Sequence, residues 1–120
     1  MYFGSASRIQ GDKIITVINY LSKNWETLPS SLKNAVKNHG GGHLNHAFFW
    51  KILSSSPQQP SSFLKKELEN AFGSLEDFTT TFNAAASSVF GSGWAWLCIK
   101  DGTLSVTSTP NQENPITAGL

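Results

Sequence analysis

Three histidines in one predicted helix have the residue type and the spacing that could bind a metal. His39, His43 and His46 follow one another at intervals of four and three residues, which places them on one face of a helix. Histidine is the commonest metal ligand, so His43 and His46 together could form a chelate. Two histidines at this spacing also occur often by chance, and neither an H-E-x-x-H motif nor a cysteine pair accompanies them. From the residues alone, a two-histidine metal site and histidines with a structural or surface role both stay open.

A run of three glycines, Gly40 to Gly42, lies directly before His43 in the same predicted helix. Each internal glycine costs about 1 kcal/mol of helix stability relative to alanine. We therefore expect that some other feature of the fold requires glycine at these positions and offsets this loss of helix stability.

Aromatic residues accompany the last histidine. Phe49 and Trp50 follow His46 closely, and Trp94 and Trp96 alternate along a predicted strand, so both face one side of it. Core packing explains such residues in most proteins. An aromatic shell also excludes water from a metal centre and tunes its potential, so both interpretations are kept.

Gln112 and Cys98 are two further residues whose side chains could take part in chemistry. Gln112 lies in a turn-rich stretch and is either an exposed loop residue or a polar partner of a metal centre. Cys98 lies in an apolar run, which favours a small buried hydrophobic residue over a reactive thiol. As the only cysteine, it excludes an intramolecular disulfide.

The composition indicates a small globular protein without a nucleic-acid or membrane partner. The chain has 120 residues, of which 39% are hydrophobic and 14% charged, and its formal net charge is +1. The lysines are scattered, whereas a phosphate-binding surface needs a basic patch. No apolar run approaches the ~20 residues of a membrane span. The N-terminal ten residues lack a basic segment followed by an apolar core, so we expect no secretory signal and an intracellular, soluble protein.

The hydrophobic pattern predicts helices first and a hairpin afterwards. Residues 1–11 carry no periodic pattern and are expected to be irregular. A helix then begins with Asp12 as its N-cap, and a second one, capped by Ser30 or Ser31, extends to about Leu53. The Ser/Pro/Gln-rich residues 54–62 form a loop.

Two shorter helices and two strands follow that loop. The helices begin at Phe63 and after Ser74, with Gly73 between them as a stop signal. The Asp101-Gly102 pair between two strand-like runs is typical of a two-residue hairpin. The fold class is therefore α+β, with a mainly helical part at residues 1–54 and an α+β part at residues 62–120.

Four motifs together resemble the iron/manganese superoxide dismutases. They occur in the order and at about the spacing seen in that family, and the resemblance extends from about Leu28 to Pro115. The motifs are GGGHLNHAFFW, FGSLEDF, FGSGWAWL and TPNQENP.

The resemblance implies a role for individual residues. His46, preceded by Asn45, matches the helical histidine that binds the redox metal, whereas His43 matches a position that is not a ligand. Gln112 matches the catalytic amide that hydrogen-bonds the metal-bound solvent. The glycines then leave room for Gln112 to approach the metal. The residues that match the aromatic shell of the active site are Phe49, Trp50, Trp94 and Trp96.

The resemblance also implies the cofactor and the reaction. Iron-type members usually bring the glutamine from the position of Gly42, so Gln112 favours manganese over iron as the cofactor. The expected activity is the metal-dependent disproportionation of superoxide to dioxygen and hydrogen peroxide. Superoxide is then the substrate, and a homodimer or tetramer is the expected assembly.

Only one of the family's four protein ligands, His46, has a match in this sequence. The resemblance therefore implies a truncated form of the fold that binds manganese or iron poorly and has little activity alone. The alternative to a superoxide dismutase is a non-catalytic remnant of the family that lacks three of the four ligands. A third interpretation is a metal-binding or interaction protein that uses His39, His43 and His46 as a stripe of imidazoles.

Overall fold

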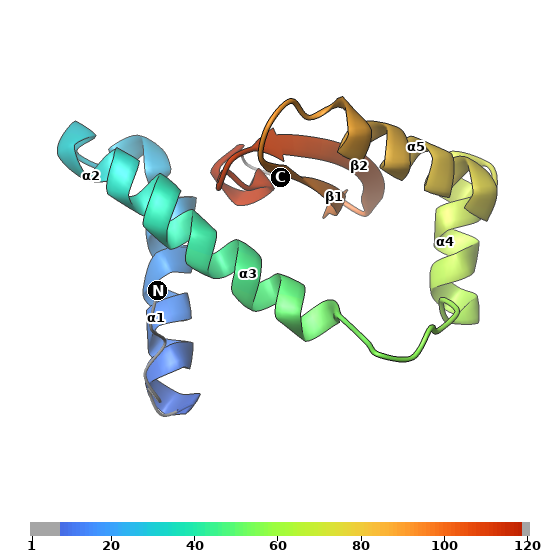
Figure 1. The fold of residues 1–120 in the computed structure, drawn as a ribbon, viewed down its shortest axis with the longest axis horizontal. Helices are drawn as coiled ribbons and strands as arrows, with labels where there is room; N and C mark the ends of the chain where they lie inside the picture. The colour runs from blue at the N-terminus through green and yellow to red at the C-terminus, as the bar shows by residue number, and fades with distance from the viewer. Residues whose placement is uncertain (1–7, 119–120) are drawn as a thin grey trace.

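The computed structural model describes residues 8–118 and has an α+β architecture, as the sequence predicts (Figure 1). A loop at residues 53–61 separates the first three α-helices from two further α-helices and a β-hairpin. The elements are α1 (Arg8–Lys23), a 3₁₀ turn (Trp25–Thr27), α2 (Ser30–Ala35), a π-helical turn (Val36–Gly40), α3 (Gly41–Ile52), α4 (Ser62–Phe72), α5 (Leu75–Ser88), β1 (Gly93–Lys100), β2 (Thr103–Pro110) and a 3₁₀ turn (Pro115–Ala118). The division into domains at residues 1–54 and 62–120 stays a prediction.

Helix α1 begins earlier than the sequence pattern indicates. It starts at Arg8, so the irregular backbone predicted for residues 1–11 is wrong for residues 8–11, and residues 1–7 lie outside the described residues. Asp12 lies inside the helix and cannot be its N-cap. The apolar periodicity begins only at Ile14, so the first turns gave no signal, and the single Gly11 costs too little to end a 16-residue helix.

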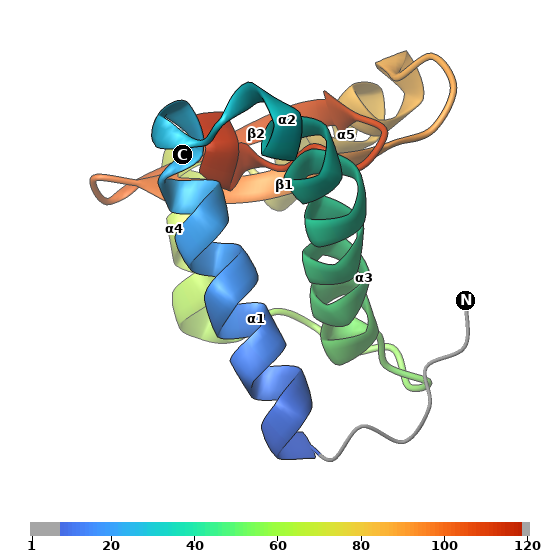
Figure 2. The same cartoon turned by 90° about the vertical axis from the view of Figure 1, so that its left-hand side faces the viewer.

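The second predicted helix is one continuous rod of three segments, α2, the π-helical turn and α3 (Figure 2). It begins at Ser30 and ends at Ile52, close to the predicted limits. The residue before it is Pro29, and no side chain caps its N-terminus, so the predicted serine cap is absent. The π-helical turn holds His39 and the first glycine of the run, and nothing in the hydrophobic pattern predicts it.

Side-chain caps fix the starts of α4 and α5. The hydroxyl oxygen of Ser61 accepts from the backbone N–H of Leu64 at 3.2 Å. The Ser74 hydroxyl accepts from the N–H of Asp77 at 2.9 Å and donates to the Asp77 carboxylate at 2.7 Å. Each bond satisfies an N–H group that the first helical turn leaves without an intrahelical partner.

The predicted hairpin is present. β1 and β2 pair in antiparallel register, with Leu97 opposite Val106 and Lys100 opposite Thr103. Asp101 and Gly102 have φ angles of 50° and 77°, the left-handed pair that a type I′ turn requires. Asparagine, aspartate and glycine adopt this conformation most readily, which is why the dipeptide predicted the turn.

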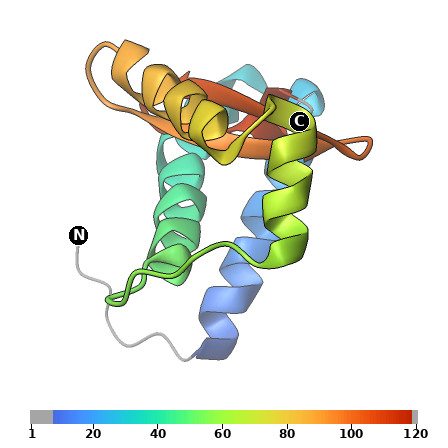
Figure 3. The same cartoon turned by 90° about the vertical axis from the view of Figure 1, so that its right-hand side faces the viewer.

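Helices α4 and α5 pack on the hairpin, whereas α1 packs on α3. α1 lies along α3, while α5 contacts both strands of the hairpin (Figure 3). Among residues 13–117, Leu68 is the one large apolar side chain that is buried, whereas Phe48, Trp50 and Ile99 are more than half exposed. Within residues 8–118, no helix has the length and apolar character that crossing a membrane requires.

Candidate metal centre

His46 and Gln112 come together although they lie far apart in the sequence. Helix α3 carries His46, and Gln112 follows β2 in the loop of residues 111–114. Trp94, near the start of β1, connects the two. Its ring meets that of His46 edge-on at 5.2 Å between centroids, and its indole N–H donates to the Gln112 side-chain oxygen at 3.4 Å.

The imidazole of His46 is oriented by its own helix. Its Nδ1 lies 2.7 Å from the backbone carbonyl oxygen of Gly42, one turn earlier. If Nδ1 carries the proton and donates it to this carbonyl, Nε2 keeps a lone pair that can bind a metal. Histidine ligands commonly donate their other ring N–H to a carbonyl in this way. His46 is exposed, so its imidazole is accessible.

The loop of residues 111–114 lies against two of the three glycines, Gly41 and Gly42 of α3. A Cβ atom on Gly41 would overlap the backbone carbonyl oxygen of Gln112. A Cβ atom on Gly42 would lie 3.4 Å from Cγ and 3.6 Å from Oε1 of the Gln112 side chain, which is ordinary contact. Gln112 therefore lies against the glycine run, and at Gly41 this close approach excludes any side chain. That the space serves a metal stays a prediction.

The predicted aromatic shell forms one connected cluster. Phe49 contacts Trp94 at 5.6 Å and Trp50 at 5.5 Å between ring centroids. Trp94 and Trp96 lie 5.9 Å apart, as expected for two residues on one side of a strand. Trp50 is 68% exposed, so it lies at the outer limit of the cluster rather than over the imidazole.

His43 and His39 do not extend this site into a metal-binding stripe. Within residues 8–118, no group of three or more histidine, cysteine, aspartate or glutamate side chains could hold a metal ion. The three-histidine site is therefore wrong for the described residues. His39 lies in the π-helical turn, where the spacing of an α-helix no longer applies.

Asn45 is the site residue for which sequence reasoning gave no role beyond its place before His46. Its side chain is 2% exposed and donates to the backbone carbonyl oxygens of Gln112 and Glu113, each at 3.2 Å. Its own oxygen accepts from the Asn114 amide at 3.3 Å. The signal in the sequence is an asparagine, a poor helix former, in the interior of an apolar helix.

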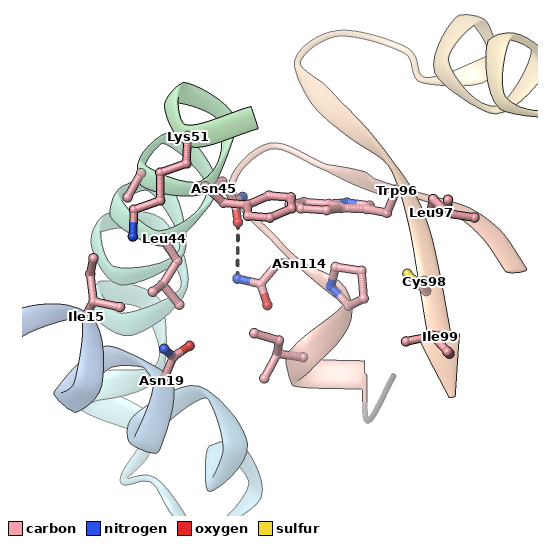
Figure 4. Close-up of a pocket in the computed structure, with 14 residues that line it drawn as sticks. Ile15, Asn19, Leu44, Asn45, Lys51, Trp96, Leu97, Cys98, Ile99 and Asn114 are labelled. Atoms are coloured by element: carbon pink, nitrogen blue, oxygen red, sulfur yellow. Dashed lines mark hydrogen bonds between the residues drawn. The ribbon is translucent and has the colours of Figure 1, made fainter. Parts of the chain in front are cut away.

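The hydrogen bonds of Asn45 to the loop of residues 111–114 form a clamp between α3 and that loop. A groove of about 390 Å³ lies beside this clamp, between α1, α3 and β1 (Figure 4). Apolar side chains such as Ile15, Leu44 and Ile99 line most of it, and neither His46 nor Gln112 does. Cys98, predicted to be buried, is half-buried in its wall. Partial burial raises the pKa of the Cys98 thiol, which disfavours the thiolate.

Comparison with known proteins places these motifs in a family. Residues 60–120 match the family model described as iron/manganese superoxide dismutases, C-terminal domain. A protein of Listeria innocua serovar 6a named superoxide dismutase [Mn] is 46% identical over 103 residues, which cover 85% of this chain and 51% of that protein.

A protein of the same name from Listeria monocytogenes serovar 1/2a is 47% identical over 100 residues, which cover 82% of this chain and 50% of that protein. This chain thus spans about half the length of the curated relatives that it matches. Because the family model covers half of the chain and the relatives extend the match across most of the remainder, the chain belongs to the iron/manganese superoxide dismutase family.

Proposed function

We propose that this chain supplies part of the active centre of a superoxide dismutase, with His46 as a ligand of manganese or iron and Gln112 as the catalytic amide beside it. One observation carries the proposal: the Nδ1 contact with the Gly42 carbonyl leaves Nε2 of His46 available as a ligand. Two similar proteins bear the name superoxide dismutase [Mn], which supports the same reaction here. Superoxide is the proposed substrate, and a homodimer or tetramer the proposed assembly.

Manganese or iron, when bound, supplies the electron exchange by which superoxide disproportionates to dioxygen and hydrogen peroxide. We favour manganese, because the Gln112 side chain lies against Gly42, the position from which iron-type members usually bring their glutamine. An added Cβ there would already contact Gln112 at 3.4 Å. A glutamine side chain at that position would therefore compete with Gln112 for the same space.

The surrounding residues orient Gln112 as a hydrogen-bond donor. The Trp94 indole N–H donates to the Gln112 side-chain oxygen, so the amide NH₂ group is turned the other way and can donate to an oxygen ligand. The rings of Phe49 and Trp94 form an apolar wall on one side of the exposed His46. Trp50 and Trp96 complete the proposed shell.

The described residues alone fit a metal only in part. They supply one oriented imidazole, and within residues 8–118 no set of three ligands forms. A redox metal needs more donors than one histidine, so the others must come from outside the described residues. We therefore expect the 120-residue chain to bind manganese weakly and to have little dismutase activity when it is the only polypeptide present.

Titration of the isotope-labelled chain with Mn²⁺ tests the metal assignment by paramagnetic broadening of NMR signals. We expect the Trp94 indole and Gln112 side-chain amide signals to broaden first, because both groups lie beside His46. His46→Ala should abolish this selective broadening. His39→Ala is the matched control, since it removes an exposed histidine outside α3 and should leave the broadening unchanged.

Broadening that survives His46→Ala, or that centres on His39, would contradict the assignment of His46. Metal analysis and a superoxide assay on the purified chain test the weak-binding part of the proposal. Stoichiometric manganese with rapid turnover would contradict the expected weak binding, because it would show that His46 is not the only ligand in the chain. If no selective broadening occurs at any Mn²⁺ concentration, the non-catalytic remnant is the better description.

A further inference from the structure

We infer that Asn45 is a positioning residue that sets where the Gln112 amide lies relative to His46; the inference rests on the function proposed above. Asn45 directly precedes His46 in α3, so one helical turn carries both the imidazole and the contact that holds the loop. The inference concerns the placement of Gln112, which is a property of the metal-free chain and can be measured in it.

The Asn45 amide uses both its donor group and its oxygen in hydrogen bonds to the loop of residues 111–114. Both amide protons are donated to consecutive carbonyl oxygens, those of Gln112 and Glu113, at 3.2 Å each. Its oxygen accepts from Asn114 at 3.3 Å, as the dashed line in Figure 4 shows. If the Asn45 amide were flipped, its oxygen would face the carbonyl oxygens of Gln112 and Glu113, and no hydrogen bond could form. The network therefore allows only one orientation of this amide.

Burial makes this clamp strong. Asn45 is 2% and Asn114 4% exposed, so removing either side chain leaves a buried or half-buried polar partner without that hydrogen bond. A second side-chain link between the long helix and the loop is the ion pair of Lys37 and Glu113 at 3.1 Å. Both of its side chains are more than one third exposed, so it holds the loop less firmly.

The clamp holds the Gln112 backbone against α3 at Gly41, where a side chain would block the approach. Gly41 lets the Gln112 carbonyl lie against α3, but a glycine cannot hold it there. Asn45 supplies that attraction through the same carbonyl oxygen. From this fixed backbone the Gln112 side chain reaches Trp94, which itself contacts His46.

The test is the indole N–H region of a ¹H–¹⁵N spectrum of the metal-free chain, in which each tryptophan gives one signal. Asn45→Ala should shift the Trp94 indole and Gln112 side-chain signals and leave that of Trp25 unchanged. Asn24→Ala is the matched control. It removes a bond of the same type, from an asparagine amide to the Tyr20 carbonyl at 2.8 Å, and should affect Trp25 but not Trp94.

Asn114→Ala keeps the two bonds from Asn45 to the loop and removes only the third, so a smaller shift of the same two signals is expected. If Asn45→Ala does not fold, the spectrum of Asn114→Ala tests the inference in its place. The inference is overturned if the Trp94 and Gln112 signals stay in place in every folded variant, even where the chain is less stable, because Asn45 would then contribute stability without positioning Gln112. Failure of the Mn²⁺ titration would not affect this outcome, since no metal is added.

Discussion

Gly41 and Gly42 are neighbours in sequence with opposite demands on a side chain. An added methyl group on Gly41 collides with a backbone carbonyl, which cannot rotate away as a side chain could. An added methyl group on Gly42 meets only the flexible side chain of Gln112. The cost of two adjacent helical glycines therefore has a steric reason at Gly41 alone.

We predict that Gly41→Ala lowers the free energy of unfolding by about 1–3 kcal/mol, because overpacking outweighs the gain in helix propensity. Gly42→Ala, the matched control, should raise it by about 0.5–1 kcal/mol, the usual gain when alanine replaces a helical glycine. Urea unfolding followed by circular dichroism measures both. Equal effects of the same sign would show that the loop does not press on Gly41.

Sequence reasoning identified the residues of this site better than the contacts that hold it. His46 and Gln112 were identified through motifs, and their roles remain proposals. Asn45 and Asn114 were not given a role, because a buried hydrogen bond between residues 69 positions apart leaves no periodic trace in the sequence. Local patterns report helix faces and turns, whereas such a clamp depends on how the loop packs.

At the scale of elements, turn and cap chemistry predicted the boundaries in the second half of the chain, whereas the caps predicted at Asp12 and at Ser30 or Ser31 were wrong. The Asp-Gly hairpin, the Gly73 stop and the Ser74 cap are present, since each depends on a few adjacent residues. The start of α1 and the π-helical turn were missed. Neither interrupts the hydrophobic pattern from which the helices were predicted.

Ser74→Ala should shorten α5 at its start and lower the free energy of unfolding by about 1 kcal/mol, because the N–H of Asp77 loses its acceptor. Ser88→Ala, near the other end of α5, is the control. Its hydroxyl only donates to the Ala85 carbonyl, so we expect a change within about 0.5 kcal/mol. Urea midpoints compare the two, and an equal loss in both variants would contradict the capping role.

At the scale of the whole molecule, the core is small for the length of the chain. Leu68 is 2% exposed, while the exposed large apolar side chains include Trp50 at 68% and Phe63 at 74%. Little apolar surface is therefore removed from water among the described residues, and the stability should depend strongly on the few side chains that are buried.

Leu68→Ala should cost about 2–5 kcal/mol, the usual range for emptying a buried leucine site. A loss of that size is a large part of the stability of any small domain, so we expect the variant to be mostly unfolded. Leu32→Ala removes a leucine that is 50% exposed and should change little. Thermal melting of the two variants gives the measurement, and a cooperative melt of Leu68→Ala near that of the parent chain would contradict the prediction.

The π-helical turn determines the angular phase of the long helix. Lys37 and Asn45 are eight residues apart, and in an unbroken α-helix eight steps of about 100° would leave them about 80° out of line. The turn absorbs roughly one residue without rotation, so they point nearly the same way, and both reach the loop of residues 111–114. Removing one residue inside the turn would yield a plain α-helix with that alignment preserved. The same deletion between the turn and Asn45, with the turn intact, would change the angle between the two residues by about 100°.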